Sequence, residues 1–354
     1  MGERPFEVNP GISACLITRN EATHLERCLL SIRQTVDEIV LVDTGSTDHT
    51  IAIARRFGAR IIEMPWSDDF SVARNAGLRT AQHEVIFIID GDEELVTPLR
   101  PAVATLVQSQ HQPWIARVLI RSPFRDARGS ERVAVSHVSR LCSNHSSIAF
   151  QGAIHEQLQD TSGLAVRVAA PIELWHHGYN LSPTQMQEKQ ARNVELLQHA
   201  INAINATTGT PESEAYRTYL VYQVGKAHMA VGRAEQARIA YASALADAAA
   251  DAPYRPELLL ALLYTLKELG LQDEVWPLLL SGLQQYPDFP DLHFFMAIAL
   301  AHFKIPDLSL IERCYQTCLN IGEKHDKYPS VEGTGSYLAQ ANLDLLHSLM
   351  SATR

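Results

Sequence analysis

The chain has 354 residues, of which 46% are hydrophobic and 20% are charged, so it can form two ordinary folded domains and is not compositionally disordered. Its formal net charge of −10 provides no basic surface for a nucleic acid, and we expect no nucleic-acid partner. No apolar run is long enough for a signal peptide or a transmembrane segment, and the five scattered cysteines contain no C-x-x-C pair, which together predict a cytoplasmic protein with reduced thiols.

Strand and helix patterns alternate through the first 95 residues. Apolar runs predict strands at 12–18, 38–43, 60–65 and 84–90, and helical patterns start at Asn20 and cover 51–57 and 70–81. This alternation predicts an α/β fold with a doubly wound, mostly parallel sheet, in which ligands bind beyond the carboxyl ends of the strands. The turns after the first, second and fourth strands read TRNE, DTGSTD and DGDEE, so the polar side chains gather at that edge.

The rest of the chain divides in two. Between residues 97 and 180, strand-like pieces at 114–120, 131–141 and 164–175 predict an α+β completion of the first domain. From Ser182 onward the patterns are helical, and their spacing of small and large residues predicts tetratricopeptide-like helix pairs with a capping helix at 337–350. An unspecific helical bundle is the alternative. We therefore predict two domains, 1–181 and 182–354.

The acidic turn Asp90-Gly91-Asp92-Glu93 follows a buried strand. Carboxylates placed so closely repel one another unless a cation lies between them, and Mg²⁺ or Mn²⁺ binds one or two carboxylates together with phosphate oxygens. Alone, an Asp-x-Asp pair is more often a solvated turn. An EF-hand loop is excluded because no third ligand and glycine follow in register.

Four segments together are more specific than any one motif. In order and spacing, ACLITRN (14–20), IVLVDTGSTDHT (39–50), DFSVARN (69–75) and IIDGDE (88–93) resemble the motifs of family-2 glycosyltransferases with the GT-A fold. Arg140-Leu141, FQGAIHE (150–156) and HHGY (176–179) resemble the branch with tetratricopeptide repeats, which includes bacteriocin S-glycosyltransferases. Gly91 and Cys142 depart from the pattern, where the family usually has Ala and Phe.

The resemblance implies a UDP-sugar donor. By this resemblance, Thr18 contacts the nucleotide, Asp43 accepts the uracil N–H, and Arg74 lies beside the base or diphosphate. It also implies that Asp90 holds ribose or metal-bound water and that Asp92 is a ligand of Mn²⁺ or Mg²⁺. The full predicted donor-binding set is Thr18, Arg19, Asn20, Glu21, Asp43, Gly45, Arg74, Asp90 and Gly91. Two structural alternatives remain: an Asp43–Arg74 ion pair, and Ser46, Thr47 and Asp48 as caps of the next helix, which we favour for Ser46 and Thr47.

Transfer with inversion needs a base that takes the proton of the acceptor. The usual Glu-Asp motif of the family is not evident, and we predict Glu156 as the base, with His155 next. A zinc protease is excluded because Gln159 replaces the second histidine of H-E-x-x-H. The structural alternative is an acid at a helix start beside a buried histidine. His176, preferred over His177 by motif position, is predicted to complete the metal shell, and a hydrogen-bonding core histidine is its alternative.

The sequence thus predicts an inverting, metal-dependent glycosyltransferase. A nucleotidyltransferase on a similar sheet is one alternative, but it would need a Gly-rich phosphate loop with Arg and Lys after the first strand, which this sequence lacks. A non-catalytic repeat scaffold is the other alternative, and the presence of Asp90, Asp92 and Arg74 counts against it. Stacked helical repeats usually bind polypeptides. We therefore predict for them either a peptide or protein acceptor or a self-association surface that forms a homodimer.

Overall fold

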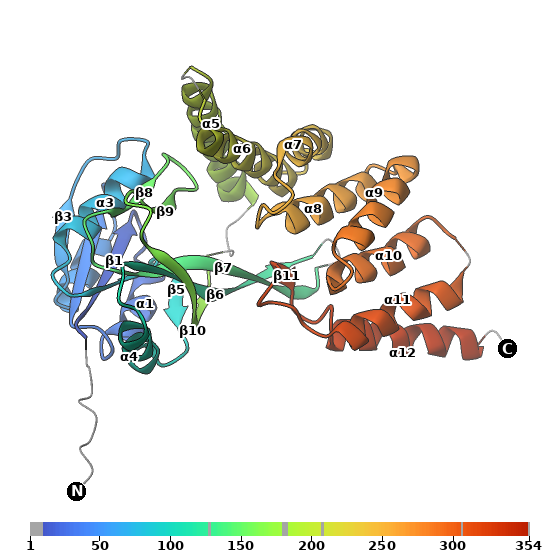
Figure 1. Cartoon of the computed structure of the whole chain (residues 1–354), viewed down its shortest axis with the longest axis horizontal. Helices are drawn as coiled ribbons and strands as arrows, with labels where there is room; N and C mark the ends of the chain where they lie inside the picture. The colour runs from blue at the N-terminus through green and yellow to red at the C-terminus, as the bar shows by residue number, and fades with distance from the viewer. Residues whose placement is uncertain (1–9, 127–128, 179–182, 207–208, 306, 353–354) are drawn as a thin grey trace, which may run out of the picture. The chain divides into compact units, whose positions relative to one another are not determined.

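The computed structural model describes residues 10–126, 129–178, 183–206, 209–305 and 307–352 (Figure 1). The chain divides into two compact units, Met1–Pro123 with His137–Asn180, and Phe124–Ser136 with Leu181–Arg354. The domain boundary predicted at 181/182 lies outside the described residues. The short segment 124–136, which the sequence analysis placed with the first domain, belongs to the second unit.

The first unit is built on a mixed sheet. Its parallel half has the order β3 (Arg60–Glu63), β2 (Glu38–Asp43), β1 (Ile12–Thr18), β4 (Val85–Ile88). The order then continues through β7 (Glu131–Ser143), β6 (Trp114–Arg125), β10 (Val166–His176) and β5 (Glu93–Leu95). Strand β7 runs antiparallel to β4, and β5 runs antiparallel to β10. The α/β prediction is confirmed, and the parallel arrangement extends from β3 to β4.

Each face of this sheet is covered. Helices α1 (Leu25–Ile32), α2 (Thr50–Arg56) and α4 (Leu99–Ser109) contribute to the apolar core of one face, and α3 (Phe70–Thr80) lies on the other face with the two-stranded sheet β8 (Ile148–Gln151) and β9 (Gln157–Asp160) (Figure 1). Successive side chains of a strand point to opposite faces. Accordingly, Ala14 and Leu16 belong to the first core and Cys15 to the second.

The first helix begins later than the sequence pattern predicted. Asn20 has a positive φ of 57°, which is incompatible with a right-handed helix, and α1 starts at Leu25. The buried residues of α1 are Leu25, Cys28, Leu29 and Ile32, the stripe that the pattern predicted. Helix α4 was not predicted.

The second unit is helical. The described helices are α5 (Pro183–Asn205), α6 (Pro211–Ala230), α7 (Ala234–Asp247), α8 (Arg255–Glu268), α9 (Gln272–Gln285), α10 (Pro290–His302), α11 (Leu308–Ile321) and α12 (Tyr337–Ala352). Helix pairs α6–α7, α8–α9 and α10–α11 followed by α12 confirm the predicted succession. Close packing requires a glycine at Gly225, where an added Cβ would lie 2.4 Å from the Tyr241 ring.

The segment Phe124–Ser136, where β6 ends and β7 begins, belongs to the second unit and gains a short strand there. Strand β11 (Ser330–Val331) pairs antiparallel with Val135 and Ala134 of β7. Asp291 of α10 anchors this strand, since its buried carboxylate accepts hydrogen bonds from the Val331 N–H (3.0 Å) and from the Thr334 hydroxyl (2.8 Å). Burial raises the pKa of Asp291 to about 6.

In the part of the chain that the structure describes, no helix combines the length and apolarity needed to cross a bilayer.

Candidate active site

Three predicted polar groups meet at the carboxyl edge of the parallel strands. Thr18 ends β1, Asp43 ends β2 directly opposite it, and Asp90 follows β4. The side chains of Thr18 and Asp43 are buried, with 3% and 2% of their surface exposed. The structure therefore brings the residues predicted from the first two turns to one edge of the sheet.

Asp43 organises the turn that follows it. Its Oδ1 accepts the N–H groups of Gly45 (3.0 Å) and Ser46 (2.8 Å), and its Oδ2 accepts the hydroxyls of Ser46 (2.5 Å) and Thr18 (3.4 Å). Gly45 has a φ of 106°, a conformation that favours glycine. A carboxylate offers about four acceptor positions. Those of Asp43 are therefore all used within the protein.

Asn20 joins the turn after β1 to the turn after β2. Its N–H donates to the Ser46 hydroxyl (2.8 Å), and its side-chain carbonyl accepts the N–H of Thr47 (2.8 Å). The expectation that Ser46 and Thr47 cap the next helix is therefore wrong. Asp48, the third candidate for a cap, does accept the N–H of Thr50 at the start of α2 (2.9 Å). Ser46 and Thr47 therefore form hydrogen bonds to Asn20 in the other turn rather than capping α2.

The remaining predicted residues of the first turn have different environments. Arg19 is exposed, whereas the N–H of Glu21 donates to the Thr50 hydroxyl (2.8 Å). A Cβ added to Gly91 would lie 3.3 Å from Cγ of Glu21 and 3.5 Å from Cγ2 of Thr18. Gly91 thus packs closely against the predicted donor-binding turn.

A chain of alternating charges runs beneath the acidic turn. Arg74 donates to Glu156 through Nε and to Oδ1 of Asp90 through Nη2 (3.0 Å). Arg140 of β7 donates through Nη2 to Oδ2 of Asp90 (2.5 Å) and to Oε1 of Glu93 (2.6 Å). The alternative Asp43–Arg74 ion pair is not formed, because Arg74 is engaged by Asp90 and Glu156.

Burial and pairing set the protonation of this chain. Burial opposes ionisation of Asp90, but Arg140 and Arg74 outweigh it and hold the pKa of Asp90 well below its usual range. Burial raises the pKa of Glu93, which is only 2% exposed. Glu93 also accepts the Asp90 N–H (2.9 Å), so it closes the turn from within.

Sequence reasoning did not assign a role to Arg140 or Glu93. Arg140 was recognised only as part of a motif, and Glu93 only as part of an acidic run. The run DGDEE gives no local signal that Glu93 is its buried member; a buried carboxylate requires a partner, and only the fold supplies it.

Asp92 and His176 form a separate pair beside this chain. His176 Nε2 lies 3.1 Å from Oδ2 of Asp92, and the side chains are 24% and 20% exposed. Burial disfavours the charged histidine, but the carboxylate of Asp92 raises its pKa, and His176 in turn lowers the pKa of Asp92. A Cβ on Gly178 would lie 1.9 Å from Oδ2 of Asp92, so the backbone passes directly against this pair.

The neighbouring histidine is used elsewhere. His177 Nε2 lies 2.9 Å from Oε2 of Glu94, and its backbone N–H donates to the Asp92 carbonyl (2.9 Å). Tyr179, the last residue of the HHGY motif, lies outside the described residues. Among the described residues there is no cluster of three His, Cys, Asp or Glu side chains suited to a metal. The protein thus offers the Asp92–His176 pair.

His155 and Glu156 lie in the loop between β8 and β9. His155 is partly buried and has a positive φ of 50°, which is uncommon for a residue with a side chain and is typical of constrained loops. The Glu156 side chain is 10% exposed and is engaged by Arg74. Arg74 thus forms ion pairs with both the predicted base Glu156 and Asp90. The Asp92–His176 pair has no ion pair with Arg74 among the described residues.

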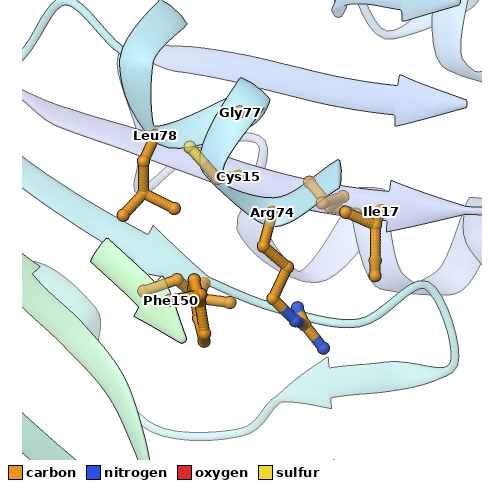
Figure 2. Close-up of a pocket in the computed structure, with 8 residues that line it drawn as sticks. Cys15, Ile17, Arg74, Gly77, Leu78 and Phe150 are labelled. Carbon is orange, nitrogen blue, oxygen red and sulfur yellow. The ribbon is translucent and has the colours of Figure 1, made fainter. Parts of the chain in front are cut away.

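An apolar pocket lies between α3 and the sheet (Figure 2). Cys15, Leu78, Phe150 and Arg74 are among the residues that line it, and it leaves no room for a water molecule. Ligand pockets usually enclose roughly 300 Å³ or more and carry several polar groups. This space is therefore a packing gap beneath Arg74 rather than the binding site of a nucleotide sugar.

Part of the chain matches a known family model. Residues 13–132 match the model "Glycosyl transferase family 2". The TPR repeat-containing protein Synpcc7942_0270 of Synechococcus elongatus is 36% identical over 196 residues, which are 53% of this chain and 47% of that protein. The SPbeta prophage-derived glycosyltransferase SunS of Bacillus subtilis is 26% identical over 54% of this chain and 45% of its own length. The matches span about half the length of these relatives.

One solved structure is similar with a lower sequence identity. The mannosyltransferase PcManGT from Pyrobaculum calidifontis, in complex with GDP-Man and Mn²⁺, is 21% identical with a TM-score of 0.39, over 86% of this chain and 91% of that one. That score is too low to transfer any residue role to this chain.

Proposed function

We propose that this chain is an inverting glycosyltransferase that moves a sugar from a UDP-sugar to an acceptor, since residues 13–132 match the model of glycosyl transferase family 2. One observation carries the proposal: Thr18, Asp43 and the acidic turn 90–93 meet at the carboxyl edge of β1, β2 and β4. Ligands of open α/β sheets bind at this edge.

The nucleoside of the donor lies in this proposal against the turns 18–21 and 43–47. Asp43 accepts the imide N–H of uracil, for which the Ser46 hydroxyl has to release Oδ2, so donor binding includes a rearrangement of the second turn. Gly45 keeps the backbone of that turn accessible. Asp90, fixed by two arginines, faces the ribose with the acceptor positions that those arginines leave.

Asp92 and His176 are the proposed ligands of Mn²⁺ or Mg²⁺. Their donor atoms, a carboxylate oxygen and an imidazole nitrogen, lie 3.1 Å apart, so both would face a single ion. The donor set of one carboxylate and one imidazole also leaves positions for diphosphate oxygens, as such ions require. When bound, the ion supplies charge that stabilises the departing diphosphate.

Glu156 is the proposed base, with His155 as the second candidate. Arg74 binds Oε1 of Glu156, and among the described residues no hydrogen bond is donated to Oε2. Oε2 is thus the atom that takes the proton of the acceptor, while Arg74 keeps the carboxylate oriented.

A peptide or protein side chain is the proposed acceptor, and a homodimer is the proposed alternative use of the repeats. Support comes from the stack of helix pairs between Pro211 and Ile321, since such stacks offer extended surfaces for polypeptides. The similarity to a protein named for its TPR repeats agrees with this assignment.

A panel of UDP- and GDP-sugars, incubated with the full chain with and without Mn²⁺, tests the proposal. We expect hydrolysis of a UDP-sugar that EDTA abolishes. Asp92→Asn keeps the shape of the side chain and should lower the rate on the order of 10²-fold or more. Asp273→Asn, on the exposed surface of α9, is the matched control and should retain the wild-type rate. Full activity in EDTA would refute the metal, and no turnover of any donor by folded protein would refute the enzyme.

A further inference from the structure

The loop with the proposed base belongs to a small sheet of its own. Strands β8 and β9 pair only with each other, from Ile148 opposite Asp160 to Gln151 opposite Gln157, among the described strand pairings. A two-stranded sheet has little stability by itself. The position of Glu156 therefore depends on what the outer edge of β8 contacts.

Asn75 of α3 occupies that edge. Its Nδ2 donates to the Phe150 carbonyl (2.9 Å), and its Oδ1 accepts the Phe150 N–H (2.8 Å). One carboxamide thus satisfies both backbone groups of a strand residue, as a neighbouring strand would. The contact joins segments separated by 75 residues in the sequence.

The same helix contacts the loop at two further points. The N–H of Phe70 donates to the Ala153 carbonyl (2.8 Å), and Arg74 binds Glu156 while its guanidinium lies 5.3 Å from the centre of the Phe150 ring. Within this set only Asn75 is uncharged and acts through its side chain alone. Its removal therefore loosens the loop without changing the charge around Asp90.

We propose that Asn75 is a positioning residue for transfer: its carboxamide fixes β8 on α3 and so places Glu156 for proton abstraction. The inference rests on the proposed function, in which Glu156 is the base. The backbone between β8 and β9 needs such support, since Gly152 and His155 have φ values of 99° and 50°. A displacement of about 1 Å in a positioned group can lower a rate by about 10²-fold.

The test compares Asn75→Ala with Arg79→Ala, an exposed position on the same helix. Four quantities are measured on the full chain: the Kd of UDP by calorimetry, the thermal melt, amide exchange in 148–156, and hydrolysis of the UDP-sugar turned over in the panel above, with water as acceptor. We expect Asn75→Ala to lower hydrolysis by about 10- to 100-fold with an unchanged UDP Kd, and to lower the melt slightly while the protein stays folded, because Phe150 loses two hydrogen bonds. Amide exchange in 148–156 should become faster in Asn75→Ala and not in Arg79→Ala.

A double variant separates this inference from the proposed function. If Asn75 acts through Glu156, adding Asn75→Ala to Glu156→Gln lowers the residual rate by little more than Glu156→Gln alone. Full multiplication of the two effects, wild-type hydrolysis by Asn75→Ala, or loss of UDP binding in that variant overturns the positioning role and leaves the proposed base intact. Wild-type hydrolysis by Glu156→Gln overturns the base and the inference together.

Discussion

Replacing Arg140 with methionine tests the charge chain beneath the acidic turn. Methionine keeps an unbranched apolar stem and removes the guanidinium. Glu93 Oε1 then loses its partner at 2.6 Å and Asp90 Oδ2 loses its partner at 2.5 Å. Asp90 retains Arg74, but no other arginine or lysine pairs with Glu93 among the described residues. The loss therefore falls mainly on Glu93, which is 2% exposed.

Removing one partner of a buried ion pair costs about 3–5 kcal/mol. For a unit of this size, about 2–4 °C per kcal/mol converts this to a fall of about 6–20 °C in the melting temperature of the first unit. The deficit depends on pH. Burial already raises the pKa of Glu93, and the variant raises it further. A neutral Glu93 stabilises the fold below its unfolded-state pKa, and this stability is lost as pH rises through its folded-state pKa. The deficit should therefore be larger at about pH 8 than at about pH 5.

Thermal and urea unfolding of the full chain, followed by near-ultraviolet circular dichroism, measures this deficit. Arg79→Met, at an exposed position of α3, is the control. The double variant Arg140→Met/Glu93→Gln removes both charges and should recover much of the lost stability. The reasoning is refuted if Arg140→Met unfolds like the wild type at both pH values, or if the effects of the two substitutions add within about 0.5 kcal/mol.

Three further outcomes follow from the contacts described above. Glu156→Gln should lower UDP-sugar hydrolysis about 10²- to 10⁴-fold while calorimetry finds the UDP Kd unchanged; a lost Kd would make Glu156 a donor-binding residue. Gly178→Ala places a Cβ 1.9 Å from Oδ2 of Asp92, so Mn²⁺-dependent turnover should fall at least about tenfold, and a wild-type rate would show that this turn adapts. Gly225→Ala brings a Cβ to 2.4 Å from the Tyr241 ring; urea unfolding of the helical unit should report a loss of about 1–3 kcal/mol with hydrolysis unchanged, and undiminished stability would contradict the tight packing.

The parts of the fold that local pattern determines were predictable from the sequence. The runs at 12–18 and 38–43 coincide with β1 and β2, because strands buried on both faces are apolar throughout. Helix α4 was missed although its buried residues Leu99, Ala102, Val103 and Leu106 have helical spacing. Strand β5 has three residues, too few for a periodic signal.

The sequence predicted which kinds of residue form the site better than it predicted which side chains pair with each other. The acidic turn and Arg74 were evident from the motifs, but the pairing of Arg140 with Glu93 joins residues 47 positions apart. It depends on β7 lying antiparallel beside β4, which no local pattern specifies. The role of Asn75 has the same origin, since a carboxamide that substitutes for a strand is recognisable only once β8 lies against α3.

The hairpin of β6 and β7 has a consequence for how such chains can exchange parts in evolution or in the laboratory. Its tip, Phe124–Ser136, folds with the helical unit and gains β11 there. A gene fragment that ends at residue 180 would keep the tip but lose its partner strand, and would expose the β7 edge at Ala134 and Val135 to pairing with other chains. Each unit is therefore discontinuous in the gene, and a functional chimera has to swap 124–136 together with the repeats.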